Sequence, residues 1–232
     1  MNTAEVIEPT RNNNPLAEPL WPPFAAMVAV AGLYAVLPSN LLGGLPHWLL
    51  GVIVVGLLVP IMITHHRGNP SLNQRLGYIL NTVVTAAMIF SLVLLIVEIA
   101  QQKVPPLRLL RSAGVLWVSN ILVSASWYWR LDAGGPHQRA KTPGHTDGAF
   151  LFPQMTMHPE AKSAAGEEDW HPNFIDYLFL AFNTSTAFSP TDVPVLSRWA
   201  KALMMIQALI SLLIIALLAG RAVNIIGQTA HS

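Results

Sequence analysis

The sequence predicts an all-α membrane protein with five transmembrane helices and a re-entrant, pore-type half-helix before the last one. Of its 232 residues, 53% are hydrophobic and only 11% are charged, whereas a typical soluble domain is about 25% charged. The charges gather in a few short stretches, as expected when whole helices lie in lipid, because a charge at the centre of a span costs about 2.5–3.5 kcal/mol. Five apolar stretches are also long enough to cross the hydrocarbon core, which takes about 20 helical residues.

The five predicted spans are apolar runs whose charges lie near their ends. They cover residues 21–37, 45–64, 76–100, 112–129 and 199–226. Pro60 lies inside the second span and is expected to kink its last turn. Glu98 is the only charge of the third span, and we expect it to reach the membrane interface.

The chain is expected to be organised in four parts. Residues 1–20 are interpreted as a mobile tail without the features of a secretory signal peptide, so the first apolar stretch would act as the targeting signal. The first three spans and their loops occupy residues 21–111. A pore-loop-like module occupies residues 112–226, with a long hydrophilic loop at 131–171, and residues 227–232 form a C-terminal tail.

Residues 172–192, with the sequence PNFIDYLFLAFNTSTAFSPTD, decide the functional interpretation. They begin as an amphipathic helix over 174–182, which is too short to span a membrane, and continue as a polar run that is poor in helix formers. Non-helical backbone is tolerated at membrane depth only where protein buries it or where it lines a water-filled cavity. Its carbonyl and hydroxyl groups can then replace the hydration shell of an ion. The expected pore-lining residues are Thr184, Ser185, Thr186, Ser189, Thr191 and Asp192.

The same pattern has a simpler explanation, in which residues 172–192 are an interfacial helix and a surface loop. Periodicity alone does not distinguish the two interpretations, because both contain a short amphipathic helix followed by polar residues.

Residues 115–224 resemble the two-helix, pore-loop unit of the potassium channel superfamily. The residues that carry the resemblance are Asp176, Tyr177, Leu178, Phe182, Thr184, Thr186 and Asp192. With Asp192 on the filter aspartate, Ser-Pro-Thr at 189–191 replaces Gly-Tyr-Gly, and Ala187 replaces a filter threonine. The resemblance implies a homo-oligomer, most simply a tetramer, with monovalent cations as partners. Potassium selectivity is not expected, because glycine permits the backbone conformations of such a filter and is missing here.

The chain also resembles an uncharacterised family of bacterial integral membrane proteins. The residues that carry this resemblance are Trp-Tyr-Trp-Arg-Leu-Asp at 127–132, Leu-Phe-Pro-Gln at 151–154 and Ala-Phe-Ser-Pro-Thr-Asp at 187–192. This resemblance implies a multi-pass protein of the bacterial plasma membrane and implies no activity.

Four further polar residues in or beside the spans are candidates for a role. Gln207 and Ser211 are spaced i, i+4 on one face of the last span, so they would line a water path or form hydrogen bonds between helices. Arg130 and Asp132 would pair and brace the pore segment. Alternatively, residues 127–129 would form an interfacial aromatic belt from which Arg130 reaches the headgroups.

Composition and motifs argue against several other classes of protein. The net charge is +1, and there is no basic patch with interleaved aromatic residues, so no nucleic-acid partner is expected. The absence of cysteine excludes disulfides, thiolate metal sites and cysteine nucleophiles. No metal-ligand spacing, phosphate-binding loop or catalytic triad is visible. We therefore expect no enzyme, metal, cofactor or catalytic residue, and the lipid bilayer as the main partner.

Three functions are consistent with the sequence. The first is an ion-channel-like pore-loop protein that is not selective for potassium. The second is a non-conducting membrane scaffold or partner-binding protein that retains the channel architecture. The third is a small-solute transporter, although the internal symmetry of inverted repeats is not visible.

Overall fold

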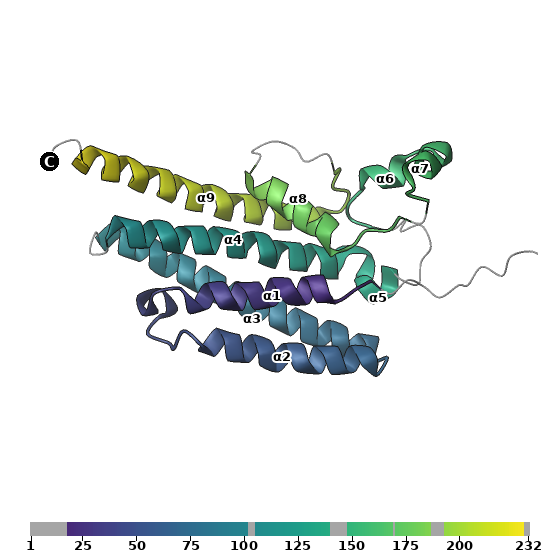
Figure 1. The fold of residues 1–232 in the computed structure, drawn as a ribbon, viewed down its shortest axis with the longest axis horizontal. Helices are drawn as coiled ribbons and strands as arrows, with labels where there is room; N and C mark the ends of the chain where they lie inside the picture. The colour runs from purple at the N-terminus through teal and green to yellow at the C-terminus, as the bar shows by residue number, and fades with distance from the viewer. Residues whose placement is uncertain (1–17, 102–104, 140–147, 169, 187–192, 230–232) are drawn as a thin grey trace, which may run out of the picture.

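The protein is described here by a computed structural model that covers residues 18–101, 105–139, 148–168, 170–186 and 193–229, the side chains of 106 and 221–229 excepted. Figure 1 shows an elongated bundle of helices with the C-terminus at one end. The elements in chain order are α1 (Trp21–Ala35), η1 (Ser39–Leu42), α2 (Leu49–His66), α3 (Pro70–Gln101), α4 (Pro106–Leu131), η2 (Asp132–Gly134), α5 (Pro136–Arg139), α6 (Pro153–Thr156), α7 (Pro159–Ala165), α8 (Phe174–Thr186) and α9 (Arg198–Thr229).

Four helices are long and apolar enough to cross a membrane, as expected for an integral membrane protein. They are α2, α3, α4 and α9. The predicted all-α class is confirmed for the described residues, but only four of the five predicted spans are helices long enough to cross a membrane. Helix α1 has 15 residues, which corresponds to about 22 Å at 1.5 Å per residue. That is less than the roughly 30 Å of a hydrocarbon core.

Local sequence explains where α1 and α3 differ from their predicted bounds. Helix α1 ends at Ala35, because Pro38 disfavours helical backbone at the residue before it and cannot donate its own N–H. Helix α3 begins at Pro70, six residues earlier than predicted. The side chain of Asn69 accepts a hydrogen bond from the backbone N–H of Leu72 at 3.3 Å, and proline is favoured at the first helical position.

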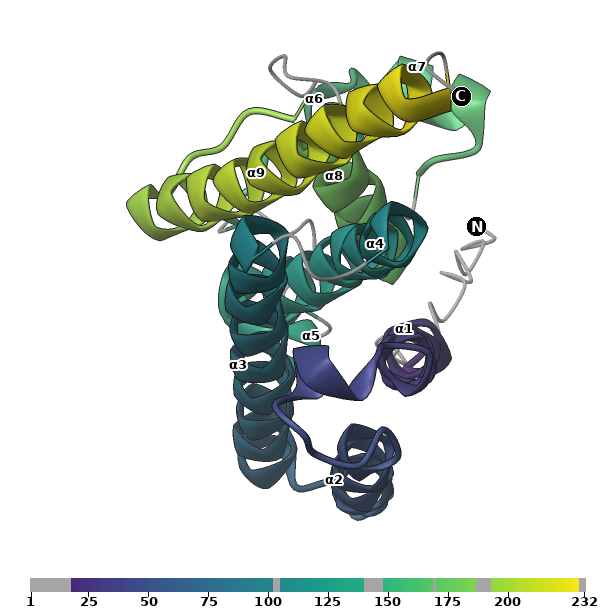
Figure 2. The ribbon, with the colours of Figure 1, turned by 90° about the vertical axis from the view of Figure 1, so that its left-hand side faces the viewer.

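Helix α4 is the central element of the bundle. Figures 1 and 2 show α8 and α9 on one side of α4 and α1–α3 on the other. In its most apolar stretch 61% of residues are buried, against 17% in α9 and 28% in α2 and α3. Two hydrophobic cores follow from this arrangement. One lies mainly among α1–α4 and includes Ile214 of α9, and the other lies mainly among α4, α8, α9 and the segment around Phe150 and includes Ala26 of α1.

Two segments predicted to be solvated are partly built into the fold. The prediction of a mobile tail over residues 1–20 is wrong for its last residues, because Glu18 is buried. The predicted hydrophilic loop 131–171 contains η2, α5, α6 and α7. Within it, Phe150 and Phe152 are buried and contact Tyr177 of α8 through their rings. Apolar residues dispersed in a polar sequence therefore fold onto the bundle.

Candidate functional site

Helix α8 enters the bundle from the end at which α4 stops, and the chain returns to that end. At its first turn, the Tyr177 hydroxyl donates to the carboxylate of Asp132, just after α4, at 2.6 Å. After α8, the backbone pairs with residues 149–151: the Leu151 N–H donates to Pro194 at 2.9 Å and the Leu196 N–H to Ala149 at 2.8 Å. The Ala149 N–H in turn donates to Asp132 at 2.5 Å. Both flanks of α8 are therefore anchored beside Asp132.

The inner end of α8 reaches the side of α9. The side-chain amide of Gln207 donates to the Ala181 carbonyl at 2.7 Å and to the Ser185 hydroxyl at 2.8 Å. Gln207 is the tenth residue of α9, about 14 Å from its start at 1.5 Å per residue. Helix α8, with 13 residues, therefore extends only part of the way along the bundle.

The predicted extended backbone from residue 183 is wrong for residues 183–186, because α8 continues to Thr186. The hydroxyls of Thr184 and Thr186 donate to the carbonyls of Leu180 and Phe182 within the helix, at 2.8 and 2.9 Å. Such local bonds satisfy a hydroxyl without a water path. The other predicted pore residues, Ser189, Thr191 and Asp192, lie outside the described residues.

Gln207 and Ser211 belong to a buried polar network that joins α4, α8 and α9. The amide of Asn120 donates to the Ser211 hydroxyl at 2.9 Å and to the Gln207 backbone carbonyl at 3.2 Å. The Tyr128 hydroxyl donates to the side-chain oxygen of Gln207. These residues and Ser185 are at most 2% exposed. Of the two predicted roles for Gln207 and Ser211, the described geometry gives hydrogen bonding between helices.

Sequence reasoning did not single out Asn120 or Tyr128 as members of this network. A signal for Asn120 was present, because it is an amide in the middle of the predicted span 112–129. Polar side chains in spans often hydrogen-bond to a neighbouring helix. Tyr128 had no comparable signal, because its position near the end of a span is typical of an interfacial residue.

The aromatic residues at the end of α4 do not form the predicted interfacial belt. Tyr128 and Trp129 are 0% and 1% exposed. The indole N–H of Trp127 donates to Thr85 of α3 at 2.9 Å, and that of Trp129 donates to Glu18 at 2.7 Å. Helices α3 and α8 and the segment before α1 cover this end of α4, so the rings serve as packing and hydrogen-bond groups.

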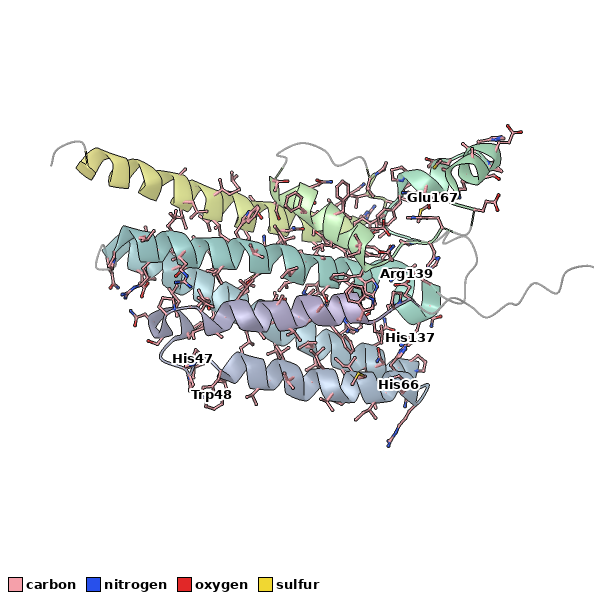
Figure 3. The ribbon with its side chains drawn as sticks, in the orientation of Figure 1. His47, Trp48, His66, His137, Arg139 and Glu167 are labelled. Atoms are coloured by element: carbon pink, nitrogen blue, oxygen red, sulfur yellow. The ribbon has the colours of Figure 1, made fainter. Side chains whose placement is uncertain are left out.

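Arg139 and Glu18 form a buried ion pair at the end of the bundle where α4 stops. The guanidinium of Arg139 on α5 contacts both carboxylate oxygens of Glu18, at 2.8 and 2.9 Å. It also donates to the backbone carbonyls of Trp129 and Asp132, at 2.7 and 2.8 Å. Figure 3 shows Arg139 where α5 meets the bundle. The pair ties the segment before α1 to the end of α4, and no sequence pattern predicted it.

The surroundings of Arg139 favour its charged form. Burial lowers the pKa of Arg139, but the electrostatic contribution of Tyr177, the hydrogen bonds to Glu18 and the charges of Glu18 and Asp132 together raise the pKa above its ordinary value. A charge in low dielectric is tolerated when it is paired and fully hydrogen-bonded. Arg139 therefore remains a fixed cation in this cluster.

Arg130 and Asp132 take separate places in the described contacts. Asp132 accepts hydrogen bonds from Tyr177 and Ala149 and so holds α8, but the predicted pair of Asp132 with Arg130 is not among the described contacts. Arg130 is 4% exposed, with its guanidinium packed against Gly77 of α3 and 5.2 Å from the ring centroid of Trp129. The predicted reach of Arg130 to lipid headgroups is wrong, because α3 covers the side chain.

No ligand set for a metal is assembled in the part of the chain that the structure describes, where no three His, Cys, Asp or Glu residues come together. The rings of His65 and His137 do lie with centroids 5.3 Å apart, where α2 and α5 meet. The polar residues near α8 instead form hydrogen bonds and an ion pair, and these contacts hold the helix in position.

Comparisons with known proteins do not place the chain in a family. No family model, no curated protein and no solved structure matches it.

Proposed function

We propose that the protein is a pore-loop membrane protein in which α8 and the segment after it form a re-entrant element of a weakly selective cation pathway. The observation that carries the proposal is the placement of α8: a helix too short to span, anchored at both flanks beside Asp132 and held at its inner end by Gln207. A re-entrant element of this kind would enter the membrane as α8 and return to the same end of the bundle. Non-helical backbone in such an element is tolerated at membrane depth only where protein encloses it or where it lines a water-filled cavity.

A pathway formed by single re-entrant elements requires several subunits, because one loop does not enclose an axis. We propose a homo-oligomer, most simply a tetramer as in channels whose filter uses four loops. Helix α9 offers a face for such assembly. Its exposed apolar side chains include Met205, Ile206, Leu209, Leu212 and Leu213. In a monomer these side chains contact lipid, and in a tetramer part of this face contacts a second copy.

The proposal assigns ion contact to residues after α8. Ser189 and Thr191 would line the narrow part, and Asp192 would concentrate cations at its mouth. Potassium selectivity is not proposed, because the filter-like run lacks glycine. The membrane would be the bacterial plasma membrane, as the resemblance to a bacterial family implies.

Ion flux in liposomes tests the proposal. Purified full-length protein is reconstituted, and efflux of K⁺, Na⁺ and Cl⁻ is followed separately. We expect cation efflux with little discrimination between K⁺ and Na⁺. The Asp192→Asn variant should reduce cation efflux several-fold, whereas Glu160→Gln, which removes an exposed acid on α7, should leave it unchanged. Vesicles as tight as protein-free ones under all three salts would overturn the proposal.

A second function, a non-conducting scaffold, is favoured by one observation. The described hydroxyls of the polar run are bonded within the subunit: Ser185 to Gln207, and Thr184 and Thr186 to their own helix. Those groups do not face an ion path in this arrangement. Oligomer mass and flux together separate the alternatives. A tetramer with flux supports the pathway, a tetramer without flux supports the scaffold, and a monomer removes the central pore.

A further inference from the structure

A cavity of about 300 Å³ lies beside the start of α4, at the opposite end of this helix from the buried ion pair. One wall is the segment 36–38, which follows α1. The other wall is a face of α4 that carries Arg108, Arg111, Ser112 and Val115. These four positions have the spacing i, i+3, i+4, i+7, which places them on one side of a helix. Two arginines therefore point to the same cavity.

The cavity follows from the different lengths of α1 and α4. Helix α1 has 15 residues and α4 has 26, and Figure 1 shows the start of α4 projecting past the end of α1. After Pro38 the chain turns into η1, which packs against α3. The face of α4 that carries the two arginines therefore extends beyond the reach of α1, and the cavity lies beside it.

The charged groups of the cavity are two cations without counter-ions. Neither the Arg108 nor the Arg111 guanidinium has an ion-pair or hydrogen-bond partner among the described residues, and both side chains are exposed. The Ser112 hydroxyl is already used, because it donates to the Arg108 carbonyl at 3.0 Å. No acidic residue occurs between Glu98 and Asp132 in the sequence, and no described acid lines the cavity. An anion in the cavity would therefore contact two guanidinium groups without a competing carboxylate.

Exposed apolar side chains place the cavity at the edge of the hydrocarbon core. Val36 lines the cavity and Leu107 precedes Arg108 in the sequence, and both are exposed. In a membrane protein such side chains contact acyl chains, whereas arginine keeps its apolar stem along hydrocarbon and extends its guanidinium to the headgroups. The cavity therefore opens at the depth where acyl chains give way to phosphate groups.

We propose that this cavity binds the phosphate and glycerol of an anionic phospholipid, with Arg108 and Arg111 donating to one phosphate and the acyl chains lying outside along the bundle. Side chains at i and i+3 begin about 5–6 Å apart, so two long arginines can reach the same phosphate, whose oxygens fit the planar guanidinium.

Charge and size both favour this ligand. Basic pockets between spanning helices bind anionic headgroups, and a zwitterionic headgroup would bring a cation that two arginines repel. A volume of about 300 Å³ is at the lower end of ligand sites, so the cavity takes the polar part of a lipid and not its chains. The inference does not depend on the proposed ion pathway.

Photolabelling of the purified full-length protein in a neutral detergent tests the proposal. The probe is a phosphatidylglycerol with a diazirine at the start of one acyl chain, and labelled peptides are identified by mass spectrometry. We expect labelling of residues 36–38 and 107–115, which unlabelled phosphatidylglycerol should suppress several-fold better than phosphatidylcholine. Equal competition by the two lipids would overturn the proposal. Competition by glycerol 3-phosphate as strong as that of phosphatidylglycerol would also overturn it, because the site would then take a soluble phosphate.

Variants of the two arginines test whether they carry the preference for an anionic lipid. Arg108→Gln and Arg111→Gln should each weaken phosphatidylglycerol binding about fivefold, the usual contribution of one basic residue at an anionic surface. The double variant should lose the preference over phosphatidylcholine. The matched control is the double variant Arg67→Gln and Arg75→Gln, which removes two exposed arginines after α2 and on the start of α3, and it should bind as wild type does.

All four arginines are exposed, so the variants should fold, and gel filtration checks this before labelling. An Arg108→Gln and Arg111→Gln protein that still prefers phosphatidylglycerol would overturn the proposal. An equal loss in the control would do so too, because the preference would then follow from net charge and not from this cavity.

Discussion

Gln207 of α9 donates a hydrogen bond of 2.7 Å to the backbone carbonyl of Ala181 in α8, and this contact fixes how far α8 extends along α9. The same side-chain amide bonds Ser185, and its oxygen accepts from Tyr128. Replacing Gln207 with leucine keeps the approximate volume and removes all three bonds. Because the partners remain buried, we expect the free energy of unfolding to fall by about 2–4 kcal/mol.

Denaturation in mixed micelles measures this loss. The matched control is Gln101→Leu, since Gln101 is exposed at the end of α3 and its replacement should change the stability by less than about 0.5 kcal/mol. Equal stabilities of the two variants would show that the network contributes little to holding α8.

Tyr177→Phe tests the anchor at the other end of α8. The hydroxyl of Tyr177 donates at 2.6 Å to Asp132, which is completely buried. Hydrogen bonds to charged groups contribute about 1.5–3 kcal/mol, and we expect a loss of that size in the same denaturation assay. Tyr34→Phe is the control, because no described group, including the neighbouring Ser91, lies in good hydrogen-bond geometry to its buried hydroxyl, and it should lose far less. If both variants lost the same amount, the ring environment and not the bond to Asp132 would account for the effect.

The apolar helices were predictable because their signal is local. A run of about 20 apolar residues identifies a span wherever its neighbours lie, and four spans follow from this rule. The short helix before the last span was also visible, since the start at Phe174 agrees with prediction. Its end was not, because Thr184 and Thr186 bond to their own helix backbone, and a polar composition does not reveal that choice.

The polar contacts around α8 depend on distant parts of the chain. Glu18 and Arg139 are 121 residues apart, and neither belongs to an apolar pattern or a motif. Phe150 is one aromatic residue in a polar segment, yet its ring lies 6.1 Å from that of Trp199 and 5.3 Å from that of Tyr128. Periodicity reports on neighbours in the sequence, so it could not identify these partners.

Removing one partner of the Glu18–Arg139 pair should lower the free energy of unfolding more than replacing both partners together would suggest. Both side chains are nearly fully buried, and removing one partner leaves an uncompensated charge, which costs about 3–5 kcal/mol. We expect Glu18→Gln and Arg139→Met each to lower the stability by such an amount. The double variant should be more stable than the sum of the single losses implies, because neither charge then remains buried.

A double-mutant cycle in detergent measures this coupling. The exposed pair Arg67 and Glu160, which lie on separate segments and have no described contact with each other, is the control, and its coupling energy should be close to zero. Additive losses for Glu18 and Arg139 would mean that the two side chains act independently, contrary to the hydrogen-bond geometry.

Gly77 of α3 is required by the close approach of Arg130 on α4. A Cβ at Gly77 would lie 1.8 Å from a terminal guanidinium nitrogen of Arg130 and 2.1 Å from its central carbon. The guanidinium is buried, so displacing it resembles overpacking, which costs about 1–3 kcal/mol. We expect Gly77→Ala to be destabilising by that amount, although alanine is the better helix former.

Gly114→Ala is the matched control for Gly77→Ala, because nothing lies within 4 Å of a Cβ at Gly114. It should stabilise α4 by about 0.5–1 kcal/mol, the usual gain of alanine over glycine inside a helix. Shortening Arg130 should relieve the clash, so the Gly77→Ala change should cost less in an Arg130→Met background than in wild type. Thermal denaturation of the wild type, Gly77→Ala, Arg130→Met, the double variant and the Gly114→Ala control measures both the loss at Gly77 and the gain at Gly114. A Gly77→Ala variant as stable as Gly114→Ala would contradict this prediction. It would mean that the Arg130 guanidinium moves aside without cost when a Cβ is added at Gly77, so that α3 and α4 are not tightly packed at this point.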